Sequence, residues 1–325
     1  MTVMLGFEML QGVLGMSESI SLLEEALSHE GMGRTFVSPK VVTDFEGGSM
    51  RFLFAADYQA GFFATKAYHN VRNTGARYVV SLYSLKNGEL LALLDGQTIT
   101  DLRTGAASGV IARRTPVDGP VSIGVIGSGN QARTQLESLA TVYHAESAFV
   151  YSPTVAHREA FAHEMSAKLG IAVTAVGSVE SAVRGRAVVA TASSSRSSEP
   201  LLRREWLDRC RLLCAVGNTR KQFSEVDAQC FLDAGLVVVD SVHAFEEAGD
   251  LMQAVKSGAG QGMNRATLAQ IVSGAAVVPR QGLVAFKSVG TALQDLALAA
   301  RCYELLHTGG TPEGSTDLGK ARSKG

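Results

Sequence analysis

A glycine-rich turn between an apolar segment and a helix-forming segment constrains the fold of this chain more than any other feature. Residues 121–126 form a strand-like run, and Gly127, Gly129 and Ala132 follow just before the helix-like segment 134–143. Gly127 permits a tight turn, Gly129 lets a pyrophosphate approach the backbone, and Ala132 allows close helix–strand packing. The helix start offers unpaired amides to phosphate. This register predicts a Rossmann-type dinucleotide site, the alternative being a glycine-rich turn that binds nothing.

Length and composition set the class of protein. The chain has 325 residues, 46% of them hydrophobic, which is enough for a large core and about two domains. Its 30 basic and 31 acidic residues leave a net charge of −1, which provides no field to attract nucleic acid or an anionic membrane. Segment 1–8 lacks the pattern of a secretion signal, and no uncharged run approaches the roughly 18 residues of a membrane span. We expect a cytoplasmic protein with a small-molecule substrate and neither nucleic acid nor membrane as partner.

The four cysteine residues do not form a metal motif. Cys210 and Cys214 are close in sequence, Cys230 and Cys302 are isolated, and no histidine cluster at zinc spacing accompanies them. We expect buried, reduced thiols. The acidic residues between 240 and 250 bracket a predicted helix start, where acids suit the helix dipole, so no metal site is predicted.

The first third of the chain is predicted to be rich in strands. An amphipathic helix is expected over 17–29, with Ser17 near its cap. A small-residue helix is expected over 99–114, before a break marked by two prolines. Strands are expected over 49–55, 61–68, 77–84 and 90–94, the last two joined by a hairpin.

From residue 121 onward, strand-like and helix-like segments alternate. Such alternation is typical of a parallel, doubly wound sheet in the α/β class. A closing helix is expected over 289–306. Strands are expected over 148–151, 172–175, 187–192, 212–216, 236–240 and 283–286.

The second strand of this region bears on which nicotinamide cofactor binds. NAD-specific sites carry an acid at the end of that strand, which takes the ribose hydroxyls. Here the strand ends in Ser152-Pro153-Thr154, with no acid, and His157 and Arg158 follow. Two hydroxyls backed by cations can bind a 2′-phosphate. NADP is therefore favoured, with NAD as the alternative if backbone amides hold the ribose and Arg158 is a solvated surface residue.

The order of the motifs resembles the ornithine cyclodeaminase/mu-crystallin family, which also includes alanine dehydrogenases of archaeal type and cyclic-imine reductases. The resemblance implies a Rossmann domain at residues 117–289, inserted in a smaller β-rich α+β domain made of residues 1–116 and 290–325. The smaller domain would bind substrate and form homodimers. The matching segments span most of the chain: 39–40, 64–68, 102–107, 126–132, 190–193, 214–217 and 287–295.

The resemblance also implies roles for particular residues. Lys66 and Arg103 fall where the family grips the substrate α-carboxylate, and Lys40 and Arg51 fall where further cations assist. An arginine fork and a lysine in a dry cleft can orient a carboxylate and polarise an adjacent C=N or C=O. Besides Gly127, Gly129, Ala132, Ser152, Thr154 and Arg158, the positions expected to line the cofactor are Thr104, Asn130, Gln131, Ser193, Gly217, Ser288 and Val289.

One departure from the family pattern concerns the loop after segment 214–217. Ornithine cyclodeaminases carry an aspartate there that handles the amine and the water, whereas this chain has Thr219. A threonine hydroxyl cannot act as a base near neutral pH or neutralise a substrate ammonium. Arg220 and Lys221 further disfavour a dicationic diamine unless Glu225 and Asp227 absorb their charge. Cyclisation of ornithine is therefore disfavoured.

Taken together, the residues and the resemblance predict an NAD(P)-dependent oxidoreductase. Hydride would pass to or from the α-carbon of a small amino acid, keto acid or cyclic imine. Two alternatives remain open: an ornithine cyclodeaminase, which is an ammonia-lyase using bound NAD, and a non-catalytic protein that binds small molecules in the presence of NADPH.

Overall fold

The computed structural model describes residues 2–71 and 75–307, and the chain divides into two compact units. Unit 1 comprises Met1–Arg103 and Thr291–Gly325, and unit 2 comprises Thr104–Gly290. Residues 308–325, which the sequence assigns to the smaller domain, lie outside the described part. The division falls inside helix α3 (Gly96–Ala112), which is the small-residue helix predicted over 99–114. The substrate and cofactor roles expected of the two domains stay predictions.

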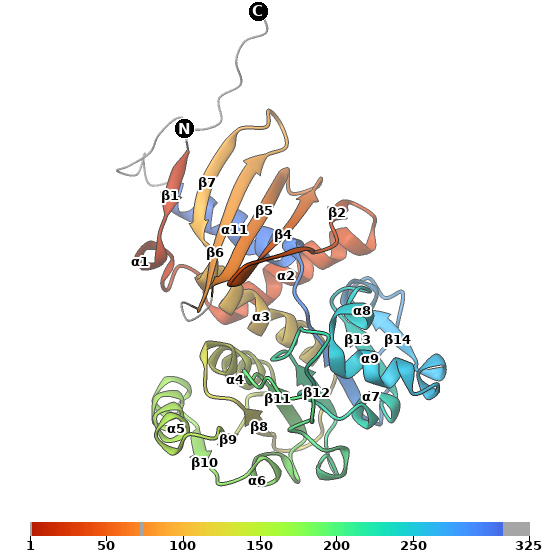
Figure 1. Ribbon diagram of the computed structural model, residues 1–325. Helices are drawn as coiled ribbons and strands as arrows, with labels where there is room; N and C mark the ends of the chain where they lie inside the picture. The colour runs from red at the N-terminus through yellow and green to blue at the C-terminus, as the bar shows by residue number, and fades with distance from the viewer. Residues whose placement is uncertain (1, 72–74, 308–325) are drawn as a thin grey trace, which may run out of the picture. The chain divides into compact units, whose positions relative to one another are not determined.

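Unit 1 is built on a seven-stranded sheet in the order β1-β7-β6-β5-β4-β2, with β3 paired to β4 (Figure 1). Neighbouring strands run antiparallel except β1 and β7, which are parallel. The four predicted strands are confirmed as β4 to β7, each at least as long as expected. The strands are β1 (Val3–Leu5), β2 (Thr35–Val37), β3 (Val41–Phe45), β4 (Gly48–Asp57), β5 (Phe62–Val71), β6 (Gly75–Ser84) and β7 (Leu90–Asp95).

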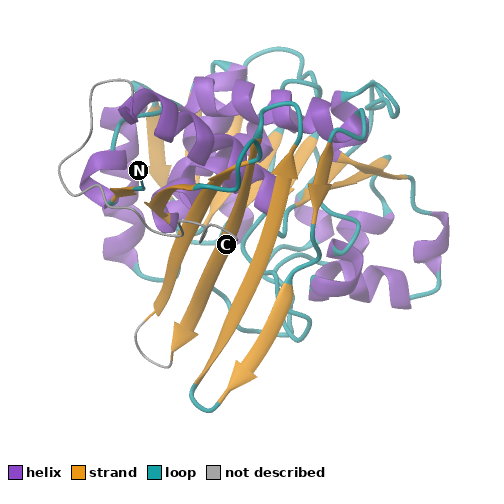
Figure 2. Cartoon of the chain, turned by 90° about the horizontal axis from the view of Figure 1, so that it is seen from above, coloured by secondary structure: helices purple, strands orange, loops and turns teal. Residues whose placement is uncertain are grey.

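Helices cover one face of this sheet. The long helix α11 (Ala292–His307) packs on β4 to β7, α2 (Met16–Gly31) packs on α11, and the short α1 (Phe7–Leu10) contacts β7. The N-cap of α2 is Gly15, two residues before Ser17, which the sequence placed near the cap. Figure 2 shows the long strands with no helix in front of their other face. The core of unit 1 is therefore one-sided, and alternate residues of β4 point toward the helices or toward the open face.

Unit 2 is built on an eight-stranded sheet in the order β10-β9-β8-β11-β12-β15-β13-β14, and every pair is parallel. The chain order reverses between β8 and β11, which is the switch point where doubly wound sheets bind ligands. The central strands are buried along their whole length, as expected of a parallel sheet covered on both faces. The strands are β8 (Ser122–Ile126), β9 (Ser147–Tyr151), β10 (Ala172–Ala175), β11 (Val188–Thr191), β12 (Leu212–Ala215), β13 (Leu236–Val239), β14 (Arg265–Thr267) and β15 (Val284–Lys287).

The connections of unit 2 include two long helices next to the glycine turn, α4 (Asn130–Tyr143) and α5 (Val155–Leu169). The fold class is confirmed as a Rossmann-type parallel sheet inserted in a smaller α+β unit. Among the described residues, no helix is long and apolar enough to cross a membrane. The shorter helices are α6 (Val179–Val183), α7 (Gln229–Leu232), α8 (Ala244–Glu247), α9 (Gly249–Lys256) and α10 (Leu268–Val272), with 3₁₀ turns at Arg204–Trp206 and Ala259–Gly262.

Candidate functional site

The glycine turn that ends β8 is shaped by two neighbouring segments. Gly127 has a φ of +116°, and a Cβ on it would come within 2.5 Å of the Ala192 carbonyl oxygen. The Gly127 amide donates a hydrogen bond of 2.8 Å to the Tyr151 carbonyl. Gly129 is the N-cap of α4, and a Cβ built there would meet nothing within 4 Å. The turn is thus tightly packed at Gly127 and has open space at Gly129, where a phosphate would meet the start of α4.

A residue that the sequence reasoning did not select holds this turn. Arg133, in α4, donates from Nη1 to the Ser128 carbonyl at 2.6 Å, and from Nε and Nη2 to the Glu164 carboxylate of α5 at 2.9 and 2.7 Å. The Glu164 carboxylate raises the pKa of Arg133, and the guanidinium lowers the pKa of Glu164. The arginine thereby connects the turn to both flanking helices. Its position directly after the fingerprint is the only signal in the sequence that could have indicated it.

A cavity of about 670 Å³ lies at the carboxyl ends of β8, β9 and β11 in unit 2. Five predicted cofactor residues line it: Gly127, Gly129, Ser152, Thr154 and Ser193. The predicted Asn130, Gln131, Ala132 and Arg158 are outside this lining. None of the lining residues is acidic: the others are Ile126, Ser128, Tyr151, Pro153, His157, Ala192, Ser194, Ser195 and Leu201.

The serine at the end of β9 is part of a hydroxyl pair in this cavity. Ser128 Oγ donates to Ser152 Oγ at 3.0 Å, and the Ser152 side chain is nearly buried. Arg158 donates from Nη1 to the Ser152 carbonyl at 2.9 Å, with its guanidinium 5.9 Å from the Tyr151 ring centre. Arg158 thus contacts the backbone of the turn that carries Ser152, and His157 is the basic side chain that lines the cavity itself.

The remaining predicted cofactor residues lie on other segments of unit 2. Thr104 is buried in α3, and its carbonyl accepts a bond from Gln135 of α4. Gly217, at the end of β12, donates its amide to the Glu225 carboxylate at 3.1 Å. Ser288 Oγ and the Val289 amide, just after β15, both donate to the buried Asp240 carboxylate, at 2.6 and 2.9 Å. The sequence reasoning assigned neither carboxylate, Glu225 or Asp240, a role in holding these segments.

In unit 1, the predicted cations Lys66 and Arg103 meet a buried carboxylate. Lys66 Nζ lies 2.7 Å from Asp295 Oδ1 and 2.6 Å from Thr100 Oγ1. Arg103 Nε lies 3.4 Å from the same Asp295 oxygen, and its Nη1 donates to Gln294 Oε1 at 3.1 Å. Each of these five side chains is less than a tenth exposed. The sequence reasoning quoted segment 287–295 as a family motif but assigned Asp295 no role.

The other two predicted cations belong to the same cluster. Arg51 and Lys66 lie on one face of the sheet, because Arg51 pairs with Tyr68 and Leu53 pairs with Lys66. The Tyr68 ring centre is 5.6 Å from the Arg51 guanidinium and 5.8 Å from Lys66 Nζ. The charge of Lys40 acts on Lys66 as well. Unit 1 therefore brings together all four cations that the resemblance assigns to substrate binding.

Burial changes the acidity of the central lysine. It lowers the pKa of Lys66 from 10.5 to about 8, the Asp295 carboxylate opposes this effect, and the charges of Arg103 and Lys40 reinforce it. A lysine of this kind is still an ammonium at neutral pH, and it loses its proton far more readily than a solvated lysine does. Buried cations beside a perturbed lysine are typical of functional sites.

Thr219, which the family pattern places at the amine-handling position, is exposed on the loop after β12. The loop is closed by the buried Asn218, whose Oδ1 accepts the Arg220 amide at 3.0 Å and whose Nδ2 donates to the Phe223 carbonyl. The hydrogen bonds of Asn218 therefore fix the backbone around Thr219, but the threonine side chain supplies no carboxylate.

Comparison with known sequences places these features in a family. A sequence model described as the ornithine cyclodeaminase/mu-crystallin family matches residues 1–310. A Delta(1)-pyrroline-2-carboxylate reductase from Bacillus cereus is 32% identical over 230 residues, which is 70% of this chain and 70% of the relative.

Comparison with solved structures gives the same family of folds. Thermococcus litoralis Delta(1)-pyrroline-2-carboxylate reductase, in complex with NADH and L-proline, superposes with a TM-score of 0.88 at 29% identity, covering 94% of this chain and 98% of that one. An archaeal alanine dehydrogenase dimer with bound NAD superposes with a TM-score of 0.87 at 26% identity, covering 95% and 97% of the two chains.

Proposed function

The chain belongs to the ornithine cyclodeaminase/mu-crystallin family, and from this premise we propose that it is an NAD(P)-dependent oxidoreductase that transfers hydride to or from the α-carbon of a small amino acid, keto acid or cyclic imine. Within that class, a five- or six-membered cyclic imine carboxylate fits best. A diamino acid would bring a side-chain ammonium as well, and Thr219 provides no anion to hold it. The pyrroline-2-carboxylate reductases among the relatives support this choice.

The observation that carries the proposal is that two buried cations, Lys66 and Arg103, share one carboxylate, that of Asp295. An acid group of the substrate would complete this cluster, because a buried cation is stable only when it is paired. Arg103 suits a carboxylate in particular, since its planar fork can donate two parallel hydrogen bonds. The charge of Lys40 also acts on Lys66, and the Arg51 guanidinium lies 5.6 Å from the centre of the Tyr68 ring that Lys66 also approaches.

Lys66 is suited to a proton transfer. Two of the three ammonium hydrogens are directed to Thr100 and Asp295, which leaves the third for a substrate atom. When bound, the nicotinamide ring supplies hydride to the imine carbon or takes it from the amine carbon. In the reductive direction Lys66 gives its proton to the imine nitrogen, so that C=N becomes CH–NH with one hydride and one proton consumed. A pKa of about 8 suits this exchange near neutral pH.

The cofactor residues of unit 2 fit a dinucleotide. A side chain at Gly127 is excluded by the Ala192 carbonyl, and the space at Gly129 leaves the start of α4 accessible. We assign NADP as the preferred cofactor, with NAD as the alternative, because the lining of the cavity offers hydroxyls and His157 but no acid where a 2′-phosphate would bind. The remaining predicted cofactor positions stay part of this proposal.

Replacing Ser152 by aspartate tests this preference. An added carboxylate would repel the 2′-phosphate, so Ser152→Asp should raise the Kd of NADPH about tenfold or more and change the Kd of NADH much less. Fluorescence titration with both cofactors measures the two values. Thr141→Asp, on an exposed position of α4, is the matched control. Equal weakening of NADPH and NADH by Ser152→Asp would contradict a phosphate site at this turn.

We also propose a homodimer formed through the open face of the unit 1 sheet. Phe36 and Phe54 stack on this face with ring centres 5.0 Å apart, and Phe52 and Val79 are each close to half exposed. Exposed apolar surface of this kind marks interaction sites, and the related alanine dehydrogenase is a dimer. Sedimentation equilibrium checks the mass.

We place the protein in the cytoplasm, where its four buried free cysteines would stay reduced.

A substrate panel tests the function as a whole. It contains pyrroline-2-carboxylate, piperideine-2-carboxylate, pyruvate with ammonia, ornithine, lysine, arginine and alanine, each with both nicotinamides. We expect oxidation of NADPH at 340 nm with a cyclic imine. Ammonia release from ornithine without net cofactor absorbance change would identify a lyase instead. Tight NADPH binding without turnover of any substrate would identify a binding protein.

A further inference from the structure

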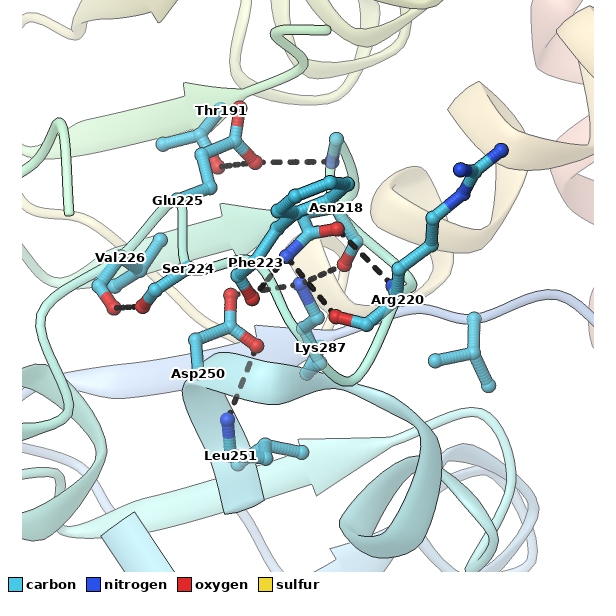
Figure 3. A network of polar contacts seen from close by, with 12 residues as sticks. Thr191, Asn218, Arg220, Phe223, Ser224, Glu225, Val226, Asp250, Leu251 and Lys287 are labelled. Atoms are coloured by element: carbon cyan, nitrogen blue, oxygen red, sulfur yellow. Dashed lines mark hydrogen bonds and ion pairs between the residues drawn. The ribbon is translucent and has the colours of Figure 1, made fainter. Parts of the chain in front are cut away.

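A fully buried carboxylate joins the ends of β11 and β12 in unit 2 (Figure 3). Glu225 Oε1 accepts the Ser193 amide at 2.6 Å. Its Oε2 accepts the Thr191 hydroxyl at 2.8 Å and the Gly217 amide at 3.1 Å. One side chain therefore takes hydrogen bonds from the last residue of β11, from the loop that follows it, and from the loop that follows β12.

The loop after β12 is shaped around this carboxylate. A Cβ at Gly217 would overlap both Glu225 carboxylate oxygens. The φ of Gly217 is outside the left-handed region, so the glycine is required by this close approach and not by backbone conformation. A side chain at position 217 would therefore displace the Glu225 carboxylate from its present position.

The partners of Glu225 offset part of the cost of burying its carboxyl group. All three groups that contact its oxygens are donors, and two of them are backbone amides that cannot accept a proton. Burial raises the pKa of Glu225, and the positive charge of Lys287 acts in the opposite direction, as do the bonds from Ser193 and Thr191. Lys287 itself is fully buried and donates to the Asn218 carbonyl at 2.6 Å and to Asp250 Oδ2 at 2.9 Å.

This network holds the segments that a cofactor must meet. Ligands of doubly wound sheets bind at the carboxyl ends of the strands, and Ser193 lines the cavity found there. Ordering a free backbone costs conformational entropy, and the binding free energy of a ligand must offset this cost if the protein has not already ordered the segment. The hydrogen bonds of Glu225 order the loops after β11 and β12 before any ligand binds.

We propose that Glu225 is a positioning residue for the nicotinamide cofactor, holding the loops after β11 and β12 in the arrangement that receives it. The proposal rests on the proposed function, since it requires that the chain bind a nicotinamide. Glu225 acts through Ser193 and Gly217 and is not assigned a contact with the cofactor. A carboxylate that only stabilised the fold would leave the affinity of the folded protein unchanged, and this difference makes the two roles separable.

Glu225→Gln is the primary test. The amide group is of the same size, but whichever side its NH₂ occupies, it faces the Ser193 or the Gly217 amide, donor against donor. We expect the Kd of NADPH to rise about tenfold at 25 °C, where the variant is still folded by circular dichroism. Glu205→Gln, the same change at an exposed position of unit 2, should leave the Kd unchanged.

Gly217→Ala provides a second route to the same contact. The added methyl group pushes against the Glu225 carboxylate, so the single variant should also raise the Kd of NADPH. In the double variant the two effects should not multiply, because both changes break one contact. If Glu225→Gln does not fold, the Kd of NADPH for Gly217→Ala and hydrogen exchange of the wild type test the positioning role instead. We expect peptides covering 192–197 and 216–224 to be protected before NADPH is added.

The outcomes separate this proposal from the function on which it rests. A wild-type protein that binds neither NADPH nor NADH would overturn the proposed function. A wild type that binds, together with a Glu225→Gln variant of lowered Tm and unchanged Kd, would overturn only the positioning role. Rapid exchange of both loop peptides in the free wild-type protein would do the same.

Discussion

Each of the two units buries one lysine against an aspartate, and the two pairs have nearly the same local geometry. In unit 1, Lys66 Nζ lies 2.7 Å from Asp295 and 2.6 Å from the Thr100 hydroxyl. In unit 2, Lys287 Nζ lies 2.9 Å from Asp250 and 2.6 Å from the Asn218 carbonyl. Neither side chain is more than 3% exposed.

The two pairs differ in the charges around them. The Asp295 carboxylate is shared by Lys66 and a second buried cation, Arg103, and the charge of Lys40 also acts on Lys66. The pair of Lys287 has a further carboxylate nearby, that of Glu225. Lys287 Nζ itself donates to the Asp250 carboxylate and to the Asn218 carbonyl. A buried ion pair alone therefore does not mark a substrate site. A carboxylate shared by two buried cations is the more informative feature, because a substrate anion can pair with the second cation.

The largest expected effect is on catalysis at the first lysine. Lys66→Met removes the proposed proton donor and part of the carboxylate clamp, so kcat/KM for a cyclic imine should fall about a thousandfold. Stability should change little, since Arg103 remains beside Asp295. Steady-state kinetics and urea unfolding measure the two effects. A variant with wild-type kinetics would show that this pair is structural, as the other is.

The second effect concerns the stability of unit 2. Lys287→Met leaves Asp250 and Glu225 buried without their cation, which should cost about 3–5 kcal/mol of unfolding free energy. Urea unfolding, followed by circular dichroism, measures the loss. Lys66→Met is the matched comparison because it makes the same change in a buried pair. Equal losses of unfolding free energy in Lys66→Met and Lys287→Met would contradict the difference between the two pairs.

The smallest expected effect is a shift in pH dependence. The Asp295 carboxylate raises the pKa of Lys66 against the effect of burial, so Asp295→Asn should lower that pKa further below about 8. Activity that needs the ammonium form is present below this pKa and is lost as pH rises through it. The groups that face Lys66 are Asp295, Thr100, Arg103, Lys40, Tyr68 and Tyr78.

The alkaline limb of kcat/KM should accordingly move to lower pH in Asp295→Asn. Initial rates between pH 6 and about 9 suffice to locate it. Asp44→Asn, at an exposed position of β3, serves as the control and should keep the wild-type profile. An unchanged limb in Asp295→Asn would mean that Lys66 does not set it.

Local patterns in the sequence were sufficient for much of the fold. The strands β4 to β7 follow from runs of apolar and β-branched residues. The turn after β8 follows from Gly127 and Gly129, which are spaced as in the strand–turn–helix unit of dinucleotide-binding sites. Short elements such as β1 and β14 were missed, because three residues carry no periodicity and owe their pairing to a neighbouring strand. The predicted cations were found through a family motif, and burial later distinguished Lys66 and Arg103 from surface cations.

The partners of these residues lay beyond the reach of any local pattern. Asp295 is 229 positions from Lys66, and Asp240 is 48 to 50 positions from the segment it holds. Which acid meets which cation depends on the register of the sheet and on which side of it each helix packs. The sequence by itself determined a dinucleotide turn and a set of cations. Only the tertiary structure decided that Lys66 shares its carboxylate with a second cation whereas Lys287 has a further carboxylate nearby, because the electrostatics of a core is set by neighbours in space.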